Sequence, residues 1–140
     1  MKILIAVDGS SYSKRMLAYL AAHDEWLGDA HRYTVVHAVA AIPPRAAAVL
    51  DKAVLKGYYE DEAEKVLKPI RSFFDKQRIK AEFVTKVGPA AEAISALAGK
   101  GKFEMVMMGS HGHSSIGNLV LGSVATKVMS QCEVPVLLIR

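Results

Sequence analysis

Short apolar runs alternate with segments of helical periodicity along the whole chain, and this alternation limits the possible folds more than any other feature. The five runs cover residues 2–7, 33–40, 79–86, 103–109 and 134–140. Strands that alternate with helices are joined by right-handed crossovers, so they pair in parallel and need helices on both faces of the sheet. The sequence therefore predicts one α/β domain, over residues 1–140, with a five-stranded parallel sheet.

The strand order follows from how doubly wound sheets grow. In the common orders the first strand is central and the direction of growth reverses early in the chain. Residues 79–86 alternate apolar and polar side chains, which fits an edge strand. We therefore expect a doubly wound sheet of order 3-2-1-4-5. Strands 1 and 4 are then neighbours, and ligands of such folds bind beyond the carboxyl ends of the strands at this reversal point.

The segments between the strands carry helix signals. Serine is a good N-cap, glycine ends helices, and proline suits a first turn but kinks a helix interior. Residues 41–59 contain two prolines and Gly57, and we expect a mobile connection with a helical part that closes over a ligand at this rim. The other helices are expected from Ser10 or Ser11 to about Leu27, over residues 58–77 with a kink at Pro69, after Pro89, and up to about Gln131.

Composition and charge exclude several classes of protein. The chain has 18 Lys and Arg against 14 Asp and Glu, but charges of both signs are interleaved, so nucleic-acid binding is not expected. No apolar run approaches the ~20 residues of a membrane span, and the first residues read as a strand rather than a signal peptide. Cys132 is the only cysteine, which excludes an internal disulfide and fits a cytoplasmic protein.

A glycine-rich stretch, GSHGHSSIGNLVLGS, follows the fourth strand over Gly109–Ser123. No acidic residue occurs from Met105 to Cys132, as expected for a segment that meets an anion. Glycines let backbone amides approach a phosphate without a Cβ in the way, and they allow positive φ where amides converge. The alternative is a glycine-rich turn without a ligand. The stretch is neither a P-loop nor a dinucleotide fingerprint, because the chain lacks both motifs.

The spacing of this stretch matches a known signature. Gly109, Gly112, Gly122 and Ser123 are spaced as G-x-x-G, nine residues, then G-[ST]. The chain thereby resembles the ATP-binding members of the universal stress protein family. The stretches ILIAVDGS, VGPAAEAI and CEVPVLLIR extend the resemblance over essentially the whole chain. The resemblance implies an ATP-binding domain that acts as a nucleotide-dependent switch or sensor in the stress response.

The resemblance also implies which residues form the site. Glycines and a serine would hold ribose and phosphates, amides of the loop and of the following helix would add donors, and the ends of the first two strands would line the adenosine side. The residues implied for ribose and phosphates are Gly109, Gly112, Gly122 and Ser123, and those that add amide donors are His113 and Val124. The residues implied for the adenosine side are Val7, Asp8, Ala38 and Val39. Met108 and Ser110, at the start of the loop, complete the set.

Asp8 ends the first strand, where the crevice of such a sheet opens. A carboxylate beside phosphates is repelled unless a cation bridges them, so Asp8 is the candidate ligand for Mg²⁺ or Mn²⁺, through one oxygen and water. The alternative role is an Asx-type turn or a cap for the helix that follows.

Three other groups of residues invite a chemical interpretation. His111 and His113 form an H-x-H pair, but two histidines without a third clustered ligand make a poor zinc site. His37, within a strand, is read as a hydrogen-bonded core histidine. Ser114 or Ser115 could accept a phosphoryl group, as the resemblance implies, although no Ser/His/Asp triad is visible.

Efficient hydrolysis of ATP is not expected, because no Lys, Arg or Gln is placed to stabilise a transferring phosphate and Lys127 lies a turn inside its helix. At most slow ATPase or autophosphorylating activity, aided by an unidentified protein partner, is expected. A second hypothesis is a dimeric scaffold or a module for AMP or another adenine nucleotide, without hydrolysis. A third, an enzyme of adenosine-phosphate chemistry, is disfavoured because the loop S-G-G-x-D-S is absent.

The fifth strand is apolar at almost every position, yet the expected order places it at a sheet edge. An open apolar edge invites strand addition, and here only Pro135 and Arg140 guard it. We therefore expect a homodimer through Val134–Arg140, as the resemblance also implies.

Overall fold

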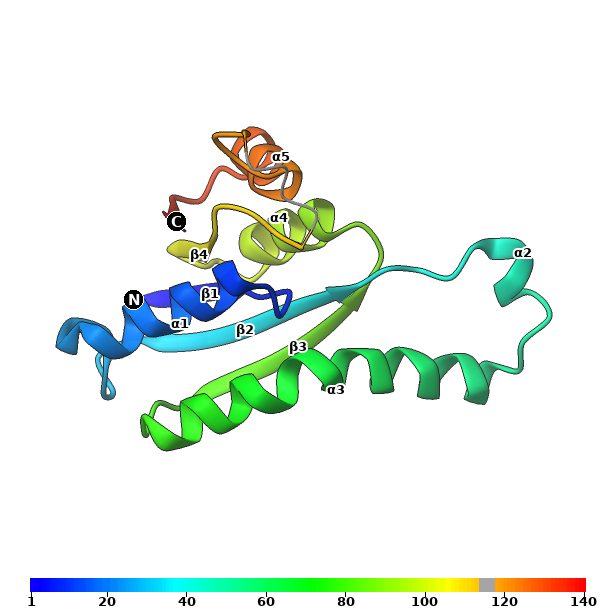
Figure 1. Cartoon of the computed structure of the whole chain (residues 1–140), viewed down its shortest axis with the longest axis horizontal. Coiled ribbons are helices and arrows are strands. Elements are labelled where there is room, and N and C mark those ends of the chain that lie inside the picture. Colours follow the sequence, from blue (N-terminus) through cyan, green and yellow to red (C-terminus); the bar gives the residue numbers. More distant parts are fainter. Residues whose placement is uncertain (114–117) are drawn as a thin grey trace.

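The computed structural model describes residues 1–113 and 118–140, which form a parallel sheet with helices on both faces (Figure 1). The strand order is β3-β2-β1-β4-β5, so the predicted fold class and order are confirmed, with β3 and β5 at the edges. In chain order the elements are β1 (Lys2–Ala6), α1 (Ser11–Ala22), a 3₁₀ turn (Asp24–Trp26), β2 (Arg32–Val39), α2 (Pro44–Ala47), α3 (Lys52–Lys76), β3 (Ala81–Val87), α4 (Ala90–Lys100), β4 (Met105–Gly109), α5 (Ser123–Gln131) and β5 (Val136–Ile139).

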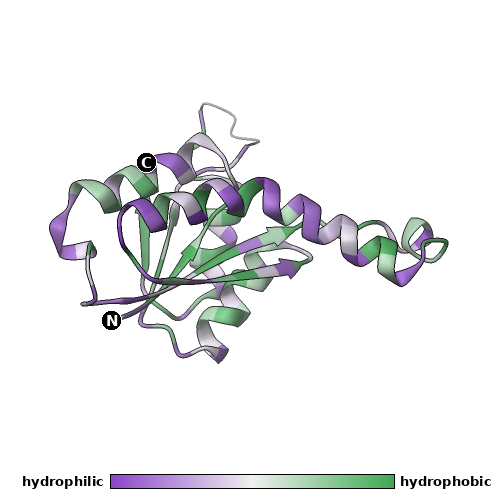
Figure 2. Ribbon diagram, turned by 90° about the horizontal axis from the view of Figure 1, so that it is seen from below, coloured by the Kyte–Doolittle hydropathy of each residue, from purple (hydrophilic) through white to green (hydrophobic). Residues whose placement is uncertain are grey.

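Two apolar clusters, one on each face of the sheet, hold the helices in place. The central strands β1 and β4 are buried almost throughout, and the apolar stretches along the strands are green in Figure 2. On one face α1 packs through Met16, Leu17 and Leu20, and α3 through Ala63, Leu67, Ile70 and Phe74; on the other, α4 packs through Ala91, Ile94 and Ala98, and α5 through Ala125 and Val128.

Helix α1 ends at Ala22, five residues before the expected Leu27. The His23 ring donates from Nδ1 to the Tyr19 carbonyl at 2.7 Å, and the His23 amide donates to Leu20, so these groups occupy the last carbonyls of the helix. A 3₁₀ turn follows at once. At the other end Ser10 is the cap, since its side chain accepts from the Ser13 amide.

Helix α3 begins at Lys52, so much of the expected mobile connection is helical. Pro69 lies inside α3 and does not end it. Four of the residues that precede α3 form the short helix α2. Both α2 and the first turns of α3 project beyond the sheet, at the right of Figure 1.

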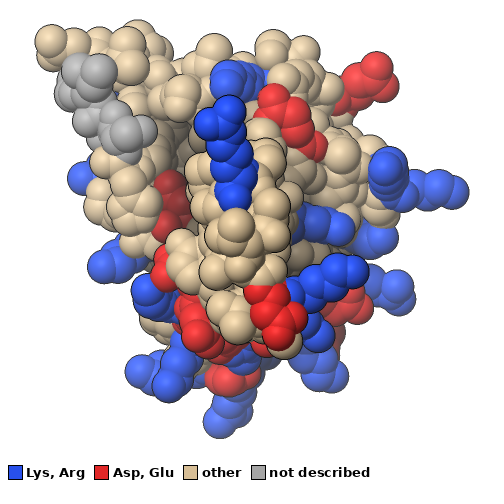
Figure 3. Space-filling model, turned by 90° about the vertical axis from the view of Figure 1, so that its right-hand side faces the viewer, with Lys and Arg blue, Asp and Glu red and all other residues tan. Residues whose placement is uncertain are grey.

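In Figure 3, Lys and Arg (blue) are interspersed with Asp and Glu (red) over the face that is turned to the viewer, without a continuous basic area. Among the residues that the structure describes, no helix combines the length and the apolar character that crossing a bilayer requires.

Candidate functional site

A crevice opens beyond the carboxyl ends of β1 and β4, where the direction of sheet growth reverses. Ala6 and Met108 are paired in the last rungs of these strands, so the turn after β1 and the loop after β4 start side by side. The crevice is open to solvent and holds about 490 Å³ of space when its open mouth is counted. It is lined by Ala6, Val7, Asp8, Ser13, Val36, His37, Ala38, Ala90, Ile94, Met108, Gly109, His111, Gly112, Val124 and Ala125.

The Asp8 carboxylate organises the turn after β1. Its Oδ1 accepts hydrogen bonds from the Ser10 amide at 2.9 Å and from the Ser13 hydroxyl at 2.8 Å, while Ser13 Oγ accepts from the Asp8 amide. Asp8 therefore does form the Asx-type turn that was its alternative role. Its second oxygen, Oδ2, lies only 2.8 Å from where a Cβ on Gly112 would stand, and it accepts no hydrogen bond from the described part of the chain.

The loop after β4 is tied to this turn and to itself. His113 Nε2 donates to the Asp8 carbonyl at 2.7 Å. His111 Nε2 donates to the Leu119 carbonyl, and His111 Nδ1 is 2.8 Å from the hydroxyl of Ser110, which is fully buried. The Gly122 amide donates back to the Ser110 carbonyl. Two segments about a hundred residues apart are thus held in direct contact.

Protein contacts require two of the loop glycines, and the positive φ expected from the sequence is not found at Gly109, Gly112 or Gly122. A Cβ on Gly109 would lie 2.7 Å from Tyr12 Cβ, and one on Gly122 would lie 2.9 Å from the Cα of His111. Both distances are shorter than side chains tolerate, so these glycines permit close packing of the loop.

The N-terminus of α5 opens onto the crevice, and no side chain within residues 1–113 and 118–140 caps it. Its N-cap is Gly122, which has no side chain to accept from the first-turn amides. Val124 and Ala125 in this first turn line the crevice. Uncapped amides and the positive end of the helix dipole favour an anion at this position.

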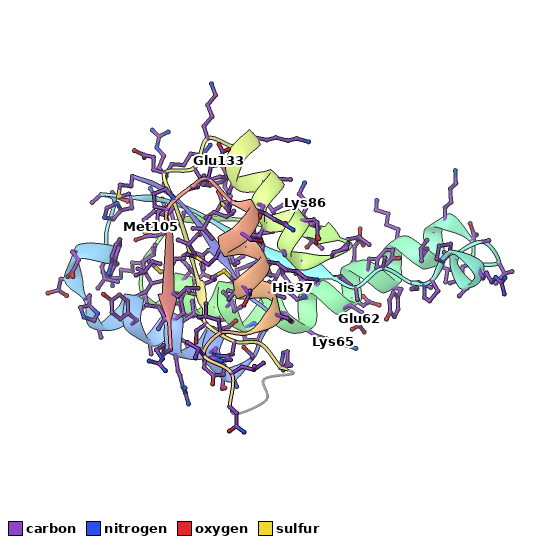
Figure 4. The ribbon with its side chains drawn as sticks, turned by 90° about the horizontal axis from the view of Figure 1, so that it is seen from above. His37, Glu62, Lys65, Lys86, Met105 and Glu133 are labelled. Atoms are coloured by element: carbon purple, nitrogen blue, oxygen red, sulfur yellow. The ribbon has the colours of Figure 1, made fainter. Side chains whose placement is uncertain are left out.

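The charge of the crevice is small. Among the described residues that line it, Asp8 is the only carboxylate, and none is Lys or Arg. His37, labelled in Figure 4, donates from Nδ1 to the Val7 carbonyl at 2.8 Å, so the expected hydrogen bond is present. It is half-buried and lines the crevice, so its placement in the core was wrong. Within residues 1–113 and 118–140 no cluster of three His, Cys, Asp or Glu side chains could hold a metal ion by itself.

The structure brings together seven of the twelve residues implied for the site. The other five do not line the crevice: Val39 is buried in the core, Ser110 and Gly122 are buried within the loop, and His113 and Ser123 are exposed. Ser114 and Ser115 lie outside the described residues. The seven that line it are Val7, Asp8, Ala38, Met108, Gly109, Gly112 and Val124.

Sequence reasoning missed most of the crevice wall that α1, α4 and α5 contribute. Ala90, Ile94 and Ala125 are small or apolar helix residues with no distinguishing pattern. Ser13 follows Asp8 by five residues, one turn beyond the cap, and this serine after an Asp-Gly-Ser turn was the one signal available.

The sequence is similar over its whole length to known proteins of one family. The model of the universal stress protein family matches residues 1–140. A universal stress protein from Thermus aquaticus, encoded in the QAH/OAS sulfhydrylase 3' region, is 35% identical over 138 residues, 99% of this chain and 97% of that protein. The chain belongs to the universal stress protein family. The universal stress protein Slr1230 of Synechocystis is 33% identical over 99% of this chain, which spans only 42% of that protein.

Solved structures of universal stress proteins share this fold at low sequence identity. The protein MJ0577 superposes with a TM-score of 0.77 at 22% identity, over 99% of this chain and 94% of that one. A universal stress protein from Archaeoglobus fulgidus, solved in complex with dAMP, gives 0.70 at 22% identity, over 100% and 98% of the two chains. One from Arabidopsis thaliana, solved with AMP bound, gives 0.71 at 14% identity, over 99% and 90%.

Proposed function

We propose that this universal stress protein binds ATP, together with Mg²⁺ or Mn²⁺, in the crevice between β1 and β4 and acts as a nucleotide-dependent switch or sensor. The observation that carries the proposal is the uncapped N-terminus of α5, which opens onto the same crevice as Asp8 and the Gly109–Gly112 loop. An anion site beside an apolar pocket at the reversal point of a doubly wound sheet suits a nucleotide. The relatives solved with AMP and dAMP support an adenine nucleotide.

The two ends of the crevice suit the two ends of such a ligand. Val7, Ala38 and Met108, with Ala90 and Ile94 of α4, form an apolar wall that would take adenine. At the other end, amides of Ser123 and Val124 would take phosphate oxygens. Asp8 Oδ2 would hold the cation through water, and the cation would offset the repulsion between carboxylate and phosphate.

Turnover of ATP is proposed to be slow. Phosphoryl transfer needs cations that stabilise the charge of the transferring group, and no lining residue is Lys or Arg. A protein partner would have to supply them. The same observation favours a second candidate, a module for AMP or another adenine nucleotide without hydrolysis, because a site without cationic side chains gains little from additional phosphates.

Calorimetric titration with ATP and Mg²⁺ tests the proposal. We expect binding by the wild type and a loss of about tenfold or more in affinity in Asp8→Asn, which removes the charge but keeps Oδ1 as the acceptor for Ser10 and Ser13. With EDTA in place of Mg²⁺, Asp8→Asn should bind ATP at least as tightly as the wild type, because no cation then offsets the repulsion between the Asp8 carboxylate and the phosphates. Equal affinity for AMP and ATP would favour the second candidate, and an absence of binding to both would reject nucleotide binding here.

A further inference from the structure

Ser13 lines the crevice from the first turn of α1 and is almost completely buried, at 3% exposure. Buried polar side chains are normally hydrogen-bonded. Both hydrogen bonds that the structure gives to the Ser13 hydroxyl join it to Asp8: its oxygen accepts from the Asp8 amide at 3.0 Å and donates to Asp8 Oδ1 at 2.8 Å. Ser13 therefore contacts the residue that is the candidate ligand for a divalent cation.

The two oxygens of the Asp8 carboxylate have different surroundings. Oδ1 accepts from the Ser10 amide at 2.9 Å as well as from Ser13, and these two donors take up both lone pairs of that oxygen. Oδ2 accepts no hydrogen bond from the described part of the chain. It is turned towards Gly112 in the wall of the crevice, 2.8 Å from the place of a Cβ on that glycine. Oδ2 is thus the oxygen left for a ligand.

A single hydrogen bond leaves an aspartate carboxylate free to turn. Rotation about its Cβ–Cγ bond has broad energy wells, so the Ser10 amide alone would hold Oδ1 without fixing the direction of Oδ2. The Ser10 amide belongs to the turn after β1, whereas the Ser13 hydroxyl belongs to the helix. Two donors from different elements on one oxygen restrict the rotation, and the direction of Oδ2 into the crevice then depends on Ser13.

We propose that Ser13 is a positioning residue for the cation of the bound nucleotide, because it holds Asp8 Oδ1 so that Oδ2 stays directed into the crevice. This role rests on the proposed binding of ATP together with Mg²⁺ or Mn²⁺. Mg²⁺ keeps several of its waters in nucleotide sites and uses only one or two carboxylates besides the phosphates. One carboxylate oxygen of fixed direction is therefore what such a cation requires from the protein.

A purely structural role, in which Ser13 only stabilises the start of α1, is the alternative. Ser10 provides the matched comparison, because it is equally buried, at 4% exposure, and its hydroxyl caps the same helix by accepting from the Ser13 amide at 3.4 Å. Within the described residues the Ser10 side chain makes no hydrogen bond to Asp8. Replacing either serine by alanine weakens the start of α1, and only Ser13→Ala frees the Asp8 carboxylate.

Calorimetric titration of the full chain with ATP, once with Mg²⁺ and once with EDTA, separates the two roles. The quantity compared is the ratio of the two dissociation constants, which measures the affinity gained from Mg²⁺. Ser13→Ala should lower this ratio about threefold or more, whereas Ser10→Ala should keep the wild-type ratio, although both variants melt at lower temperatures than the wild type. In the Asp8→Asn background, Ser13→Ala should not change the ratio further, because Ser13 acts through the carboxylate.

A second variant covers the case in which Ser13→Ala does not fold, as circular dichroism would show. Ser13→Cys fills nearly the same space with a weaker donor and should also lower the ratio.

Failure of the proposed function and failure of the Ser13 role give different results. A wild type that binds no ATP, or gains no affinity from Mg²⁺, would reject the site for nucleotide and cation and the role of Ser13 with it. A gain that Asp8→Asn lowers but both Ser13 variants leave intact would overturn only the role of Ser13. Equal decreases in Ser10→Ala and Ser13→Ala would also overturn it, because Ser13 would then act through the start of α1 alone.

Discussion

At the scale of single residues, Gly122 shows how little room the loop leaves. Its amide donates to the Ser110 carbonyl, and a Cβ would stand 3.2 Å from that same oxygen and 2.9 Å from His111 Cα. Any larger residue must therefore move the backbone of His111, whose ring holds the far end of the loop through Leu119.

We expect Gly122→Val to destabilise the protein by about 1–3 kcal/mol, the usual cost of overpacking. Urea denaturation without nucleotide measures it. Gly99→Ala in α4 is the matched control, because nothing lies within 4 Å of the added Cβ, and it should leave the free energy of unfolding unchanged or slightly higher. A Gly122→Val protein of wild-type stability would show that the loop can shift at no cost.

Tyr33 is the residue for which we expect a distinct dependence of stability on pH. Its hydroxyl donates to the Trp26 carbonyl at 2.6 Å, and burial raises its pKa from 10.0 to about 12. As the pH rises, the Tyr33 hydroxyl loses its proton in the unfolded chain before it does so in the folded chain. The contribution of the protonated hydroxyl to the free energy of unfolding is therefore complete below pH 10 and is lost as the pH rises from 10 to about 12.

The free energy of unfolding at pH 9 and at pH 11, measured for the wild type and for Tyr33→Phe, tests this expectation. The variant is the reference because all other groups titrate in both proteins. Between these values the wild type should lose on the order of 1 kcal/mol more than the phenylalanine variant. Identical losses in the two proteins would show that Tyr33 ionises alike when folded and unfolded.

The site residues divide by the kind of signal that they carry. Asp8, Gly109 and Gly112 stand in motifs and at strand ends, where topology alone predicts a crevice. The sequence shows His111 as part of the H-x-H pair with His113. Its hydrogen bonds to Ser110 and Leu119 depend on the path of the loop, which the spacing of residues in the sequence does not predict. Ile94 and Ala125 line the crevice only because of how α4 and α5 pack, and no local pattern records that packing.

At the scale of elements, strand positions were predictable and helix ends were not. The buried strands are apolar runs between turn residues, and all five were found within three residues of their ends. Helix α1 ends early because the His23 ring reaches back to Tyr19, a contact that competes with the glycine stop at Gly28. Helix α3 begins early because neither Gly57 nor the exposed sequence before it prevents helix formation.

The segment between β2 and α3 remains the candidate lid over a nucleotide. It follows Ala38, which lines the crevice, and none of its residues lines the crevice in the structure. We expect ATP with Mg²⁺ to slow cleavage by a protease between residues 41 and 51 about threefold or more, if the segment closes. Cleavage near Arg78, beyond the far end of α3, provides the internal reference. Equal rates at both places with and without ATP would reject closure.

At the scale of the whole molecule, β5 leaves an apolar edge open. Ser110 and Val106 donate their amides to the carbonyls of Ile139 and Pro135, so the odd-numbered residues of β5 face β4. The amides of Val136 and Leu138 then face outward, where a second β5 could pair with them.

We predict a homodimer through this edge that Leu138→Pro dissociates, because proline removes an outward donor without breaking a bond to β4. Sedimentation equilibrium gives the mass. Leu137→Pro is the contrasting variant, since it removes an inward donor and should lower the melting temperature. An unchanged mass for Leu138→Pro would place the dimer contact elsewhere.

The pairing of β1 with β4 has a consequence for how the protein is made. Ile3 pairs with Met105, so the centre of the sheet stays incomplete until most of the chain has left the ribosome. A nascent polypeptide that stops short of β4 would leave one side of β1 bare and would lack half of the crevice. Ligand binding by a growing chain would therefore mark the moment at which synthesis has passed the first turn of α5, which completes the crevice.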